Sequence, residues 1–424
     1  MGELYHVSAY GRIGRFLSWM SLSALCVIML YSMMLYVFWG RSYIVYLAIV
    51  IFCMIRLCFL KRTISRKNLI ACFFCLLMYS VLDLFHIEGI VSLISYTLRH
   101  VFLVWLVILL SEEEKERLVV LFTRIFTVIV GISLLFYALY LLGVDLPYGT
   151  VRYESNTGYP DFRCYLFFLL RNEPSLIIRF QSVFLEPGHL GMVSALLLYV
   201  NDYSLRRPAV WVLFIALFVS LSLAAYVLLL IGLLLRYVLI GKGLLRRLVL
   251  SSIWLSLVLV LVLSYYMYDP EAAFSKRIVE RFEYNEEKGI SGNNRTTASF
   301  DSYYAHFFQT GDCLLGVGKE EFIQASWGVR GGGNSSYKTF IVQYGLIGVF
   351  FVFLFFSVYA YLHKSKLLMG LLFLYVFSFL QRPYALWEVE LFLFIGYAVY
   401  VNKCLIISKN RNEKENKLFD YYSP

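Results

Sequence analysis

Apolar residues along this chain gather in long runs that short polar segments separate. A helix needs about 20 mainly apolar residues to cross roughly 30 Å of hydrocarbon, and twelve such runs can be marked. An even number of spans puts both termini on the same side. The predicted spans are residues 17–39, 43–60, 68–86, 90–110, 118–141, 188–203, 208–221, 223–240, 248–266, 336–358, 367–381 and 390–407.

The composition agrees with a membrane protein. Of 424 residues, 60% are hydrophobic and 16% are charged, and the mean hydropathy is +0.71. A water-soluble core could not bury so much apolar side chain, so a bilayer must solvate most of it. We therefore expect an all-α polytopic membrane protein, with two long external loops that carry short in-plane helices.

The charged residues orient these spans. Lys and Arg cluster in the connections on one side, for example in residues 61–67, 206–207 and 242–247, whereas the short loops opposite contain only Arg41 and Arg382. The positive-inside rule then predicts that both termini are cytoplasmic. Residues 208–240 could instead form one long helix, which would invert everything downstream, but the charge placement opposes it. The net charge of +10 therefore reports orientation, and no nucleic-acid partner is expected.

The spans and loops divide the chain into six regions. The two long external segments are where function is expected, because long loops on a rigid scaffold commonly carry it. The regions are an N-terminal five-span bundle (1–142), a first external loop (143–187), central spans (188–266), a second, larger external loop (267–335), a C-terminal three-span bundle (336–407) and a cytoplasmic tail (408–424).

Parts of both loops have the pattern of helices that lie on a membrane surface. Phe274, Ile278 and Phe282 recur at helical spacing beside charged residues, and the segment Cys164–Leu170 is apolar but too short to span. In-plane helices are one interpretation. A helix packed on the protein's own outer face is the other.

Several familiar motifs fail in detail. The glycines from Gly311 to Gly318 before Lys319 suggest a phosphate loop, but Cys313 and Glu320 occupy positions that require Gly and Ser or Thr. The external loops have no dense cluster of His, Cys or carboxylates. We therefore expect no metal site and no cofactor.

The most informative stretch is residues 179–191, at the outer entrance of the sixth predicted span. Arg179 and Glu186 are seven residues apart and would share one face of a helix, while Pro187 and Gly188 favour a break where the chain enters the membrane. A charged pair at a lipid–water boundary is costly and is kept mainly for function. The alternative is a structural ion pair that anchors the loop.

The second loop adds further candidate ligands. Arginine forks suit phosphate oxygens, so a diphosphate at the membrane surface would fit, although each arginine could also simply solvate the loop. Aromatic rings stack on sugar faces and could line a glycan groove. The candidates are Arg277, Arg281, Arg295 and Arg330 for the diphosphate, and Tyr303, Tyr304, Trp327 and Asn334 for the glycan.

These segments together resemble a known family. Residues 179–191 resemble the Arg…Glu-Pro signature of the O-antigen polymerase (Wzy) group within the polymerase and ligase superfamily, and Ser220-Leu221-Ser222 resembles its polar break between short spans. Residues 315–318, followed by 334–348, are similar to its loop end and following span. The resemblance covers roughly residues 175–355. One departure is Asn334-Ser335, where many relatives, ligases especially, place a His.

The resemblance implies a metal-independent membrane glycosyltransferase. It would transfer a growing glycan from undecaprenyl diphosphate onto a lipid-linked repeat unit, at the outer face of a bacterial inner membrane. Glu186 would be the base, with Arg179, Arg295 and Arg281 as the first candidates for the diphosphate. The implied partners are the undecaprenyl diphosphate-linked oligosaccharide, the lipid bilayer and a chain-length regulator of the Wzz type.

Two alternatives remain open. One is an O-antigen ligase, although the missing His weakens it. The other is a lipid-linked oligosaccharide flippase or another transporter, because twelve spans and the arginines Arg56, Arg99 and Arg124 within or beside them could serve a transport pathway. The external loop of about 65 residues and the absence of repeated halves favour an enzyme.

Overall fold

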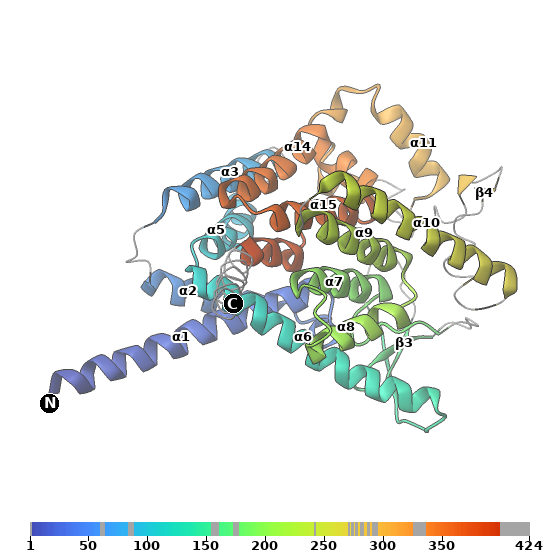
Figure 1. The fold of residues 1–424 in the computed structure, drawn as a ribbon. Coiled ribbons are helices and arrows are strands. Elements are labelled where there is room, and N and C mark those ends of the chain that lie inside the picture. The colour runs from blue at the N-terminus through green and yellow to red at the C-terminus, as the bar shows by residue number, and fades with distance from the viewer. Residues whose placement is uncertain are drawn as a thin grey trace, which may run out of the picture.

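The fold is known from a computed structural model, and it is predominantly helical (Figure 1). The start of α1 lies at the left of Figure 1, whereas β3, β4 and α11 lie towards the right. The structure describes residues 2–59, 64–83, 89–153, 161–172, 178–240, 243–269, 296–324 and 336–398, with scattered positions between 272 and 290.

Helices occupy the apolar ranges of the N-terminal region. The fourth range is interrupted by a π-helical segment, Thr97–Phe102, between two short helices. The elements are α1 (Gly2–Ser32), α2 (Ser42–Phe59), α3 (Arg66–Asp83), α4 (Ile90–Tyr96), α5 (Leu103–Ile108) and α6 (Glu112–Leu141).

The central and C-terminal apolar ranges are also helical. A further helix covers residues 388–398, and the rest of the last predicted span lies outside the described residues. The elements are α7 (Pro187–Val200), α8 (Pro208–Val219), α9 (Leu223–Ile240), α10 (Leu244–Tyr268), α14 (Tyr337–His363) and α15 (Lys366–Gln381).

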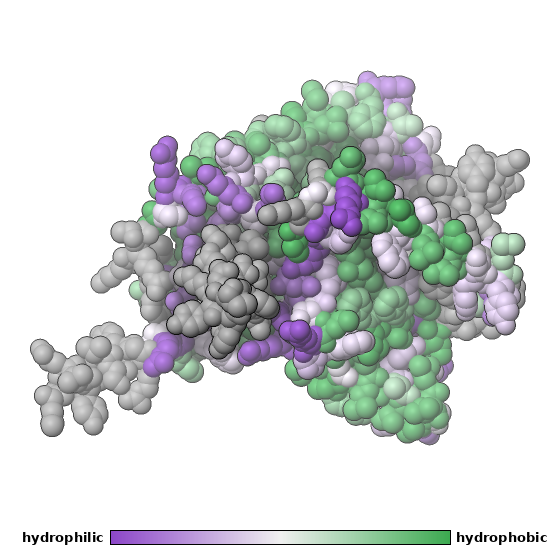
Figure 2. Space-filling model, in the orientation of Figure 1, coloured by the Kyte–Doolittle hydropathy of each residue, from purple (hydrophilic) through white to green (hydrophobic). Residues whose placement is uncertain are grey.

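Several of these helices can cross a membrane by length and composition. Among the described residues there are five, within α1, α6, α9, α10 and α14, and the other apolar helices are shorter. Large apolar side chains such as Trp254, Val260 and Leu261 of α10 are exposed. Hydrophobic residues cover broad continuous areas of the face in Figure 2. This surface is compatible with a membrane protein, and the count of twelve crossings stays a prediction.

The first predicted span is wrong at its C-terminal end. It was expected to reach residue 39, but α1 ends at Ser32 and the chain turns at Met34, whose φ is 55°. Leu35 then forms a β-bridge with Phe184. Trp39 packs on Phe162 with ring centroids 5.4 Å apart. These apolar residues therefore cover the first loop and do not continue the helix.

The first loop contains a small sheet and not the in-plane helix predicted for Cys164–Leu170. The strands β1 (Gly149–Val151), β2 (Phe162–Cys164) and β3 (Leu169–Arg171) pair antiparallel in that order. Phe162 is buried and its neighbour Arg163 is exposed, which is the two-residue period of a half-buried strand. Length and apolarity alone could not distinguish the two structures.

The described part of the second loop contains short helices. They are α11 (Ala298–Phe307) and α12 (Lys319–Gln324), beside a two-stranded pair of β4 (Tyr284–Asn285) and β5 (Gly289–Ile290). The predicted helical pattern of Phe274, Ile278 and Phe282 lies outside the described residues. Buried Phe300, Phe307 and Phe322 pack α11 and α12 against Ile341 and Val342 of α14.

Helix α14 contains a kink that contacts residues 314–318, the segment before α12. Gly345 has φ 67° inside α14, a conformation that disfavours side chains. The residues before α12 replace the interrupted helical bonds: the amides of Val317 and Gly318 donate to the carbonyls of Val342 and Gln343, at 2.9 and 3.0 Å. The segment 314–318 and the kink therefore form one unit.

Replacing Gly345 by Ala is expected to destabilise this unit by about 2 kcal/mol or more. A Cβ at position 345 would overlap the carbonyl group of Leu314 and would also require an unfavourable positive φ. Gly311→Ala is the matched control, because a Cβ there meets no atom within 4 Å. Thermal unfolding of the purified variants in detergent measures the difference. Equal melting temperatures for the two variants would contradict the docked loop.

Candidate active site at the start of helix α7

Glu186 stands immediately before α7, where the chain changes from extended to helical. Its φ and ψ are −138° and 144°, and Pro187 occupies the first helical position. Proline suits this position because it lacks an N–H that would have no helical partner and its φ is already helical. The predicted break at Pro187 and Gly188 is therefore confirmed as the beginning of α7.

The carboxylate of Glu186 forms an ion pair with Arg382, from the end of α15. The Nη2 of Arg382 donates to Oε2 of Glu186. The arginine side chain is 6% exposed, whereas the glutamate side chain is 22% exposed. A Cβ at Gly188 would lie 3.1 Å from this Nη2, so the glycine leaves room for the guanidinium. The pair presents its carboxylate, and not its cation, to the surroundings.

Arg179 makes a contact that the sequence did not predict. The residues between Arg179 and Glu186 are not helical, so the prediction that the two share one helix face is wrong. Instead, Arg179 Nε donates to the carbonyl of Ser220 at 3.1 Å, just after α8 ends. Carbonyls at a helix C-terminus lack helical donors, and a guanidinium satisfies them. Arg179, half-buried, therefore fixes the loop to the end of α8.

The polar break after α8 brings Arg179 towards the start of α7. Ser220–Ser222 is a turn with φ 46° at Leu221, so α8 and α9 are separate helices, as preferred over the single long helix. Gly191 of α7 packs against this turn: a Cβ there would lie 3.0 Å from Ser220 Oγ and 3.2 Å from Ser222 Cβ. Ser220, which accepts the hydrogen bond from Arg179, therefore lies beside α7, the helix that begins just after Glu186.

Four further residues at this site were missed by the sequence analysis. His189 Nε2 lies 3.2 Å from the hydroxyl of Tyr384, and Trp387 packs on the imidazole with ring centroids 5.4 Å apart. Arg382 lies over the Tyr384 ring, 5.9 Å from its centroid. One signal was available, because Arg382 is a rare cation in the short loops that the sequence predicts to be external. Pairing it with Glu186 needed the fold.

This arrangement can perform two chemical tasks. A partly exposed carboxylate can accept a proton from a hydroxyl group, and nearby guanidinium groups can stabilise a developing negative charge. Tyr384 can donate or accept a hydrogen bond beside them. Trp387 Nε1 donates to the carbonyl of Ser32 at 2.6 Å, which fixes the loop after α15 to the end of α1. The hydrogen-bond donors of the site and the carboxylate of Glu186 are therefore on loops that helix ends fix in place.

The two predicted glycan-binding tyrosines lie at a second place, on α11. Tyr303 and Tyr304 are half-buried, and the ring of Tyr304 lies 5.2 Å from Lys338 Nζ at the start of α14. The same Nζ pairs with Asp301 at 2.7 Å. Burial raises the pKa of Tyr304 to about 12, so its hydroxyl remains a hydrogen-bond donor at neutral pH. This suits a polar ligand such as a sugar.

The remaining predicted site residues lie outside the described residues. They are Arg277, Arg281, Arg295, Arg330, Trp327 and Asn334. Within the described part of the chain, no group of three or more His, Cys, Asp or Glu side chains is arranged to hold a metal ion.

Comparison with known proteins adds no further assignment. No protein-family model, curated protein or solved structure matches the chain.

Proposed function

We propose that this protein is a polysaccharide polymerase of the O-antigen type. In this proposal, it crosses a bacterial inner membrane twelve times with both termini in the cytoplasm, and the site at Glu186 faces the periplasm or exterior. It transfers a growing glycan from undecaprenyl diphosphate onto a lipid-linked repeat unit. The resemblance of residues 175–355 to the Wzy group supports the substrate class.

One observation carries the proposal: the ion pair between Glu186 and Arg382 at the meeting point of helix ends. Burying a guanidinium is costly unless it is paired, so retention of this pair at the start of α7 favours a functional role. Its residues come from the loop before α7 and from the short loop after α15. A structural anchor would not need a carboxylate that remains partly exposed.

The reaction assigns one task to each group. Glu186 accepts the proton of the acceptor hydroxyl as its oxygen forms a bond to the anomeric carbon of the donor. The bond between that carbon and the diphosphate oxygen breaks, and undecaprenyl diphosphate leaves with the electron pair. Arg382 orients the carboxylate, and Arg179 contributes positive charge for the departing diphosphate.

The second loop completes the site in this proposal. Arg277, Arg281, Arg295 and Arg330 supply further cations to the diphosphate, while Tyr303, Tyr304, Trp327 and Asn334 bind the glycan. The short helix α11 supports this arrangement, because Lys338 and Asp301 join it to the first turn of α14. A Wzz-type chain-length regulator is the proposed protein partner.

Loss of the protein distinguishes the proposed activity from its alternatives. In a host that depends on it, deletion is expected to leave single repeat units attached to the cell surface and to remove longer chains. Gel separation of surface glycans by chain length measures this. Loss of all attached units would indicate a ligase, and accumulation of repeat units on the cytoplasmic side of the membrane would indicate a flippase; either result would refute the polymerase.

A further inference from the structure

We propose that a groove between α1 and α6 binds the headgroup of an anionic phospholipid, with Arg124 as its main phosphate contact. The groove has a volume of ≈ 540 Å³. It is formed by the first half of the apolar part of α1 (Ile13–Ser32) and the first half of α6, which places it at the end of these helices opposite to the side where α7 begins after Glu186 in the twelve-span arrangement. By the charge pattern, this is the cytoplasmic leaflet.

The lining follows one face of each helix. Residues three, four and seven apart lie on the same side of a helix, and both faces follow this spacing. The α1 face starts with Arg15 and continues to apolar side chains, whereas the α6 face starts with Glu113 and ends at Arg124. The lining of α1 is Arg15, Ser18, Trp19 and Leu22, and that of α6 is Glu113, Glu116, Arg117, Val120, Leu121 and Arg124.

Arg124 is the unusual member of this lining. Its side chain is exposed on a helix long and apolar enough to cross a membrane, and among the described residues its guanidinium has no ion pair or side-chain hydrogen bond. It lies eight positions beyond Glu116, roughly 12 Å further along the helix. A guanidinium at that depth is costly without an anion. A lipid phosphate would supply one.

The acidic residues of the groove lie at its entrance. Glu113 pairs with Arg117 at 3.5 Å, and their side chains are 76% and 56% exposed. An exposed pair of this kind is weak, so a phosphate could compete with it for Arg117. With three arginines and two glutamates in the lining, the groove favours an anionic headgroup over a zwitterionic one.

The apolar part of the lining favours a lipid over free phosphate. Trp19 is 61% exposed, and it lies with Leu22, Val120 and Leu121 along the groove. A free phosphate would leave these side chains uncovered, whereas an acyl chain would bury them. Tryptophan is also common at the level of lipid headgroups. A phospholipid would contact both the arginines and the apolar side chains of the lining.

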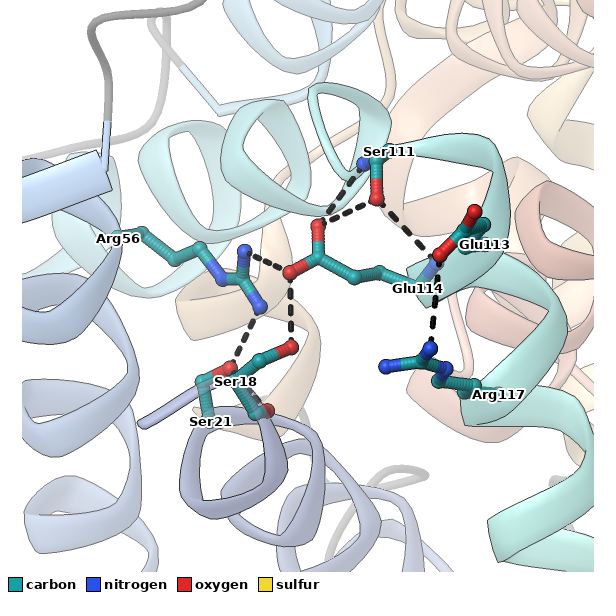
Figure 3. Close-up of polar contacts among 7 residues, drawn as sticks. All are labelled: Ser18, Ser21, Arg56, Ser111, Glu113, Glu114 and Arg117. Atoms are coloured by element: carbon teal, nitrogen blue, oxygen red, sulfur yellow. Dashed lines mark hydrogen bonds and ion pairs between the residues drawn. The ribbon is translucent and has the colours of Figure 1, made fainter. Parts of the chain in front are cut away.

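A buried polar cluster holds the two walls in place. Ser18 of α1 donates to Glu114 of α6 at 2.9 Å, and Arg56 of α2 donates to the same carboxylate at 2.8 Å. Figure 3 shows Arg117 and Glu113 beside this cluster, on the α6 side. The groove is therefore preformed, which lowers the entropic cost of binding a ligand.

Native mass spectrometry of the purified full-length protein tests the proposal. Phosphatidylglycerol is expected to bind about tenfold more tightly than phosphatidylcholine, and Arg124→Gln is expected to remove most of that preference. Arg124→Lys should retain part of it. The matched control is Arg246→Gln, which removes an exposed cation at the start of α10, outside the groove.

A second measurement keeps the test valid if a variant folds poorly. Brominated phosphatidylglycerol should quench tryptophan fluorescence in the unsubstituted protein more than in Trp19→Phe. Equal quenching, or an unchanged lipid preference in a monodisperse Arg124→Gln variant, would overturn the proposal. Displacement of the lipid by millimolar glycerol phosphate would show a phosphate site and would also overturn the lipid assignment.

Discussion

Replacing Glu186 by Gln is expected to remove long-chain polymer from the host surface and leave single repeat units attached. A positioned general base contributes about 10²–10⁴-fold to a rate, and the amide cannot accept the proton. Gln has nearly the same shape and can still accept a hydrogen bond from Arg382, so the loop before α7 should be retained. The chain-length distribution of surface glycan is the measurement.

Two further variants separate a catalytic role from a structural one. Glu112→Gln changes an exposed glutamate at the start of α6 and should leave the polymer unchanged. The charge swap Glu186→Arg with Arg382→Glu restores an ion pair but moves the carboxylate to the loop after α15. The swapped protein is expected to insert normally and to remain inactive. Recovery of polymer by the swap would show that the pair serves only as an anchor.

Replacing Arg56 by Ala is expected to destabilise the protein by about 3–5 kcal/mol, the largest stability effect that we predict. Arg56 is 7% exposed, and it pairs with Glu114 at 2.8 Å and donates to Ser21 Oγ at 2.6 Å (Figure 3). Removing it leaves the carboxylate of Glu114 without its cation in a poorly hydrated place. Thermal or denaturant unfolding in detergent measures the loss.

The exposed arginine Arg117 is the matched control for this prediction. Arg117→Ala removes an i,i+4 pair with Glu113 and should cost about 0.3–0.5 kcal/mol. The double replacement Arg56→Met with Glu114→Leu should recover much of the stability lost by Arg56→Ala, because it leaves no unpaired buried charge. A double variant as unstable as Arg56→Ala would contradict this explanation.

The pattern of apolar runs predicted the helical ranges well, for a physical reason. A helix in a bilayer satisfies its own backbone, so its length and apolarity are visible locally. The break at Ser220–Ser222 and the start of α7 at Pro187 were also visible, because serine and proline act on their own backbone. Each of these features is set by residues that are close to one another in the sequence.

The features that the sequence did not predict depend on contacts between residues that are far apart in the sequence. The run after Ser32 was apolar enough to extend a span, but Leu35 and Trp39 pack on the first loop. The partner of Glu186 lies 196 positions away, at Arg382, and no local spacing reports such a pair. Arg179 and Glu186 were assigned to one helix face, but the residues between them are not helical.

The most direct test of the central claim uses the purified protein in detergent with lipid-linked repeat units as the only substrate. The proposal predicts that undecaprenyl diphosphate-linked glycan becomes longer without added nucleotide or metal, and that the Glu186→Gln protein leaves it at one unit. No elongation by an intact, correctly folded protein, or equal elongation by both proteins, would contradict it.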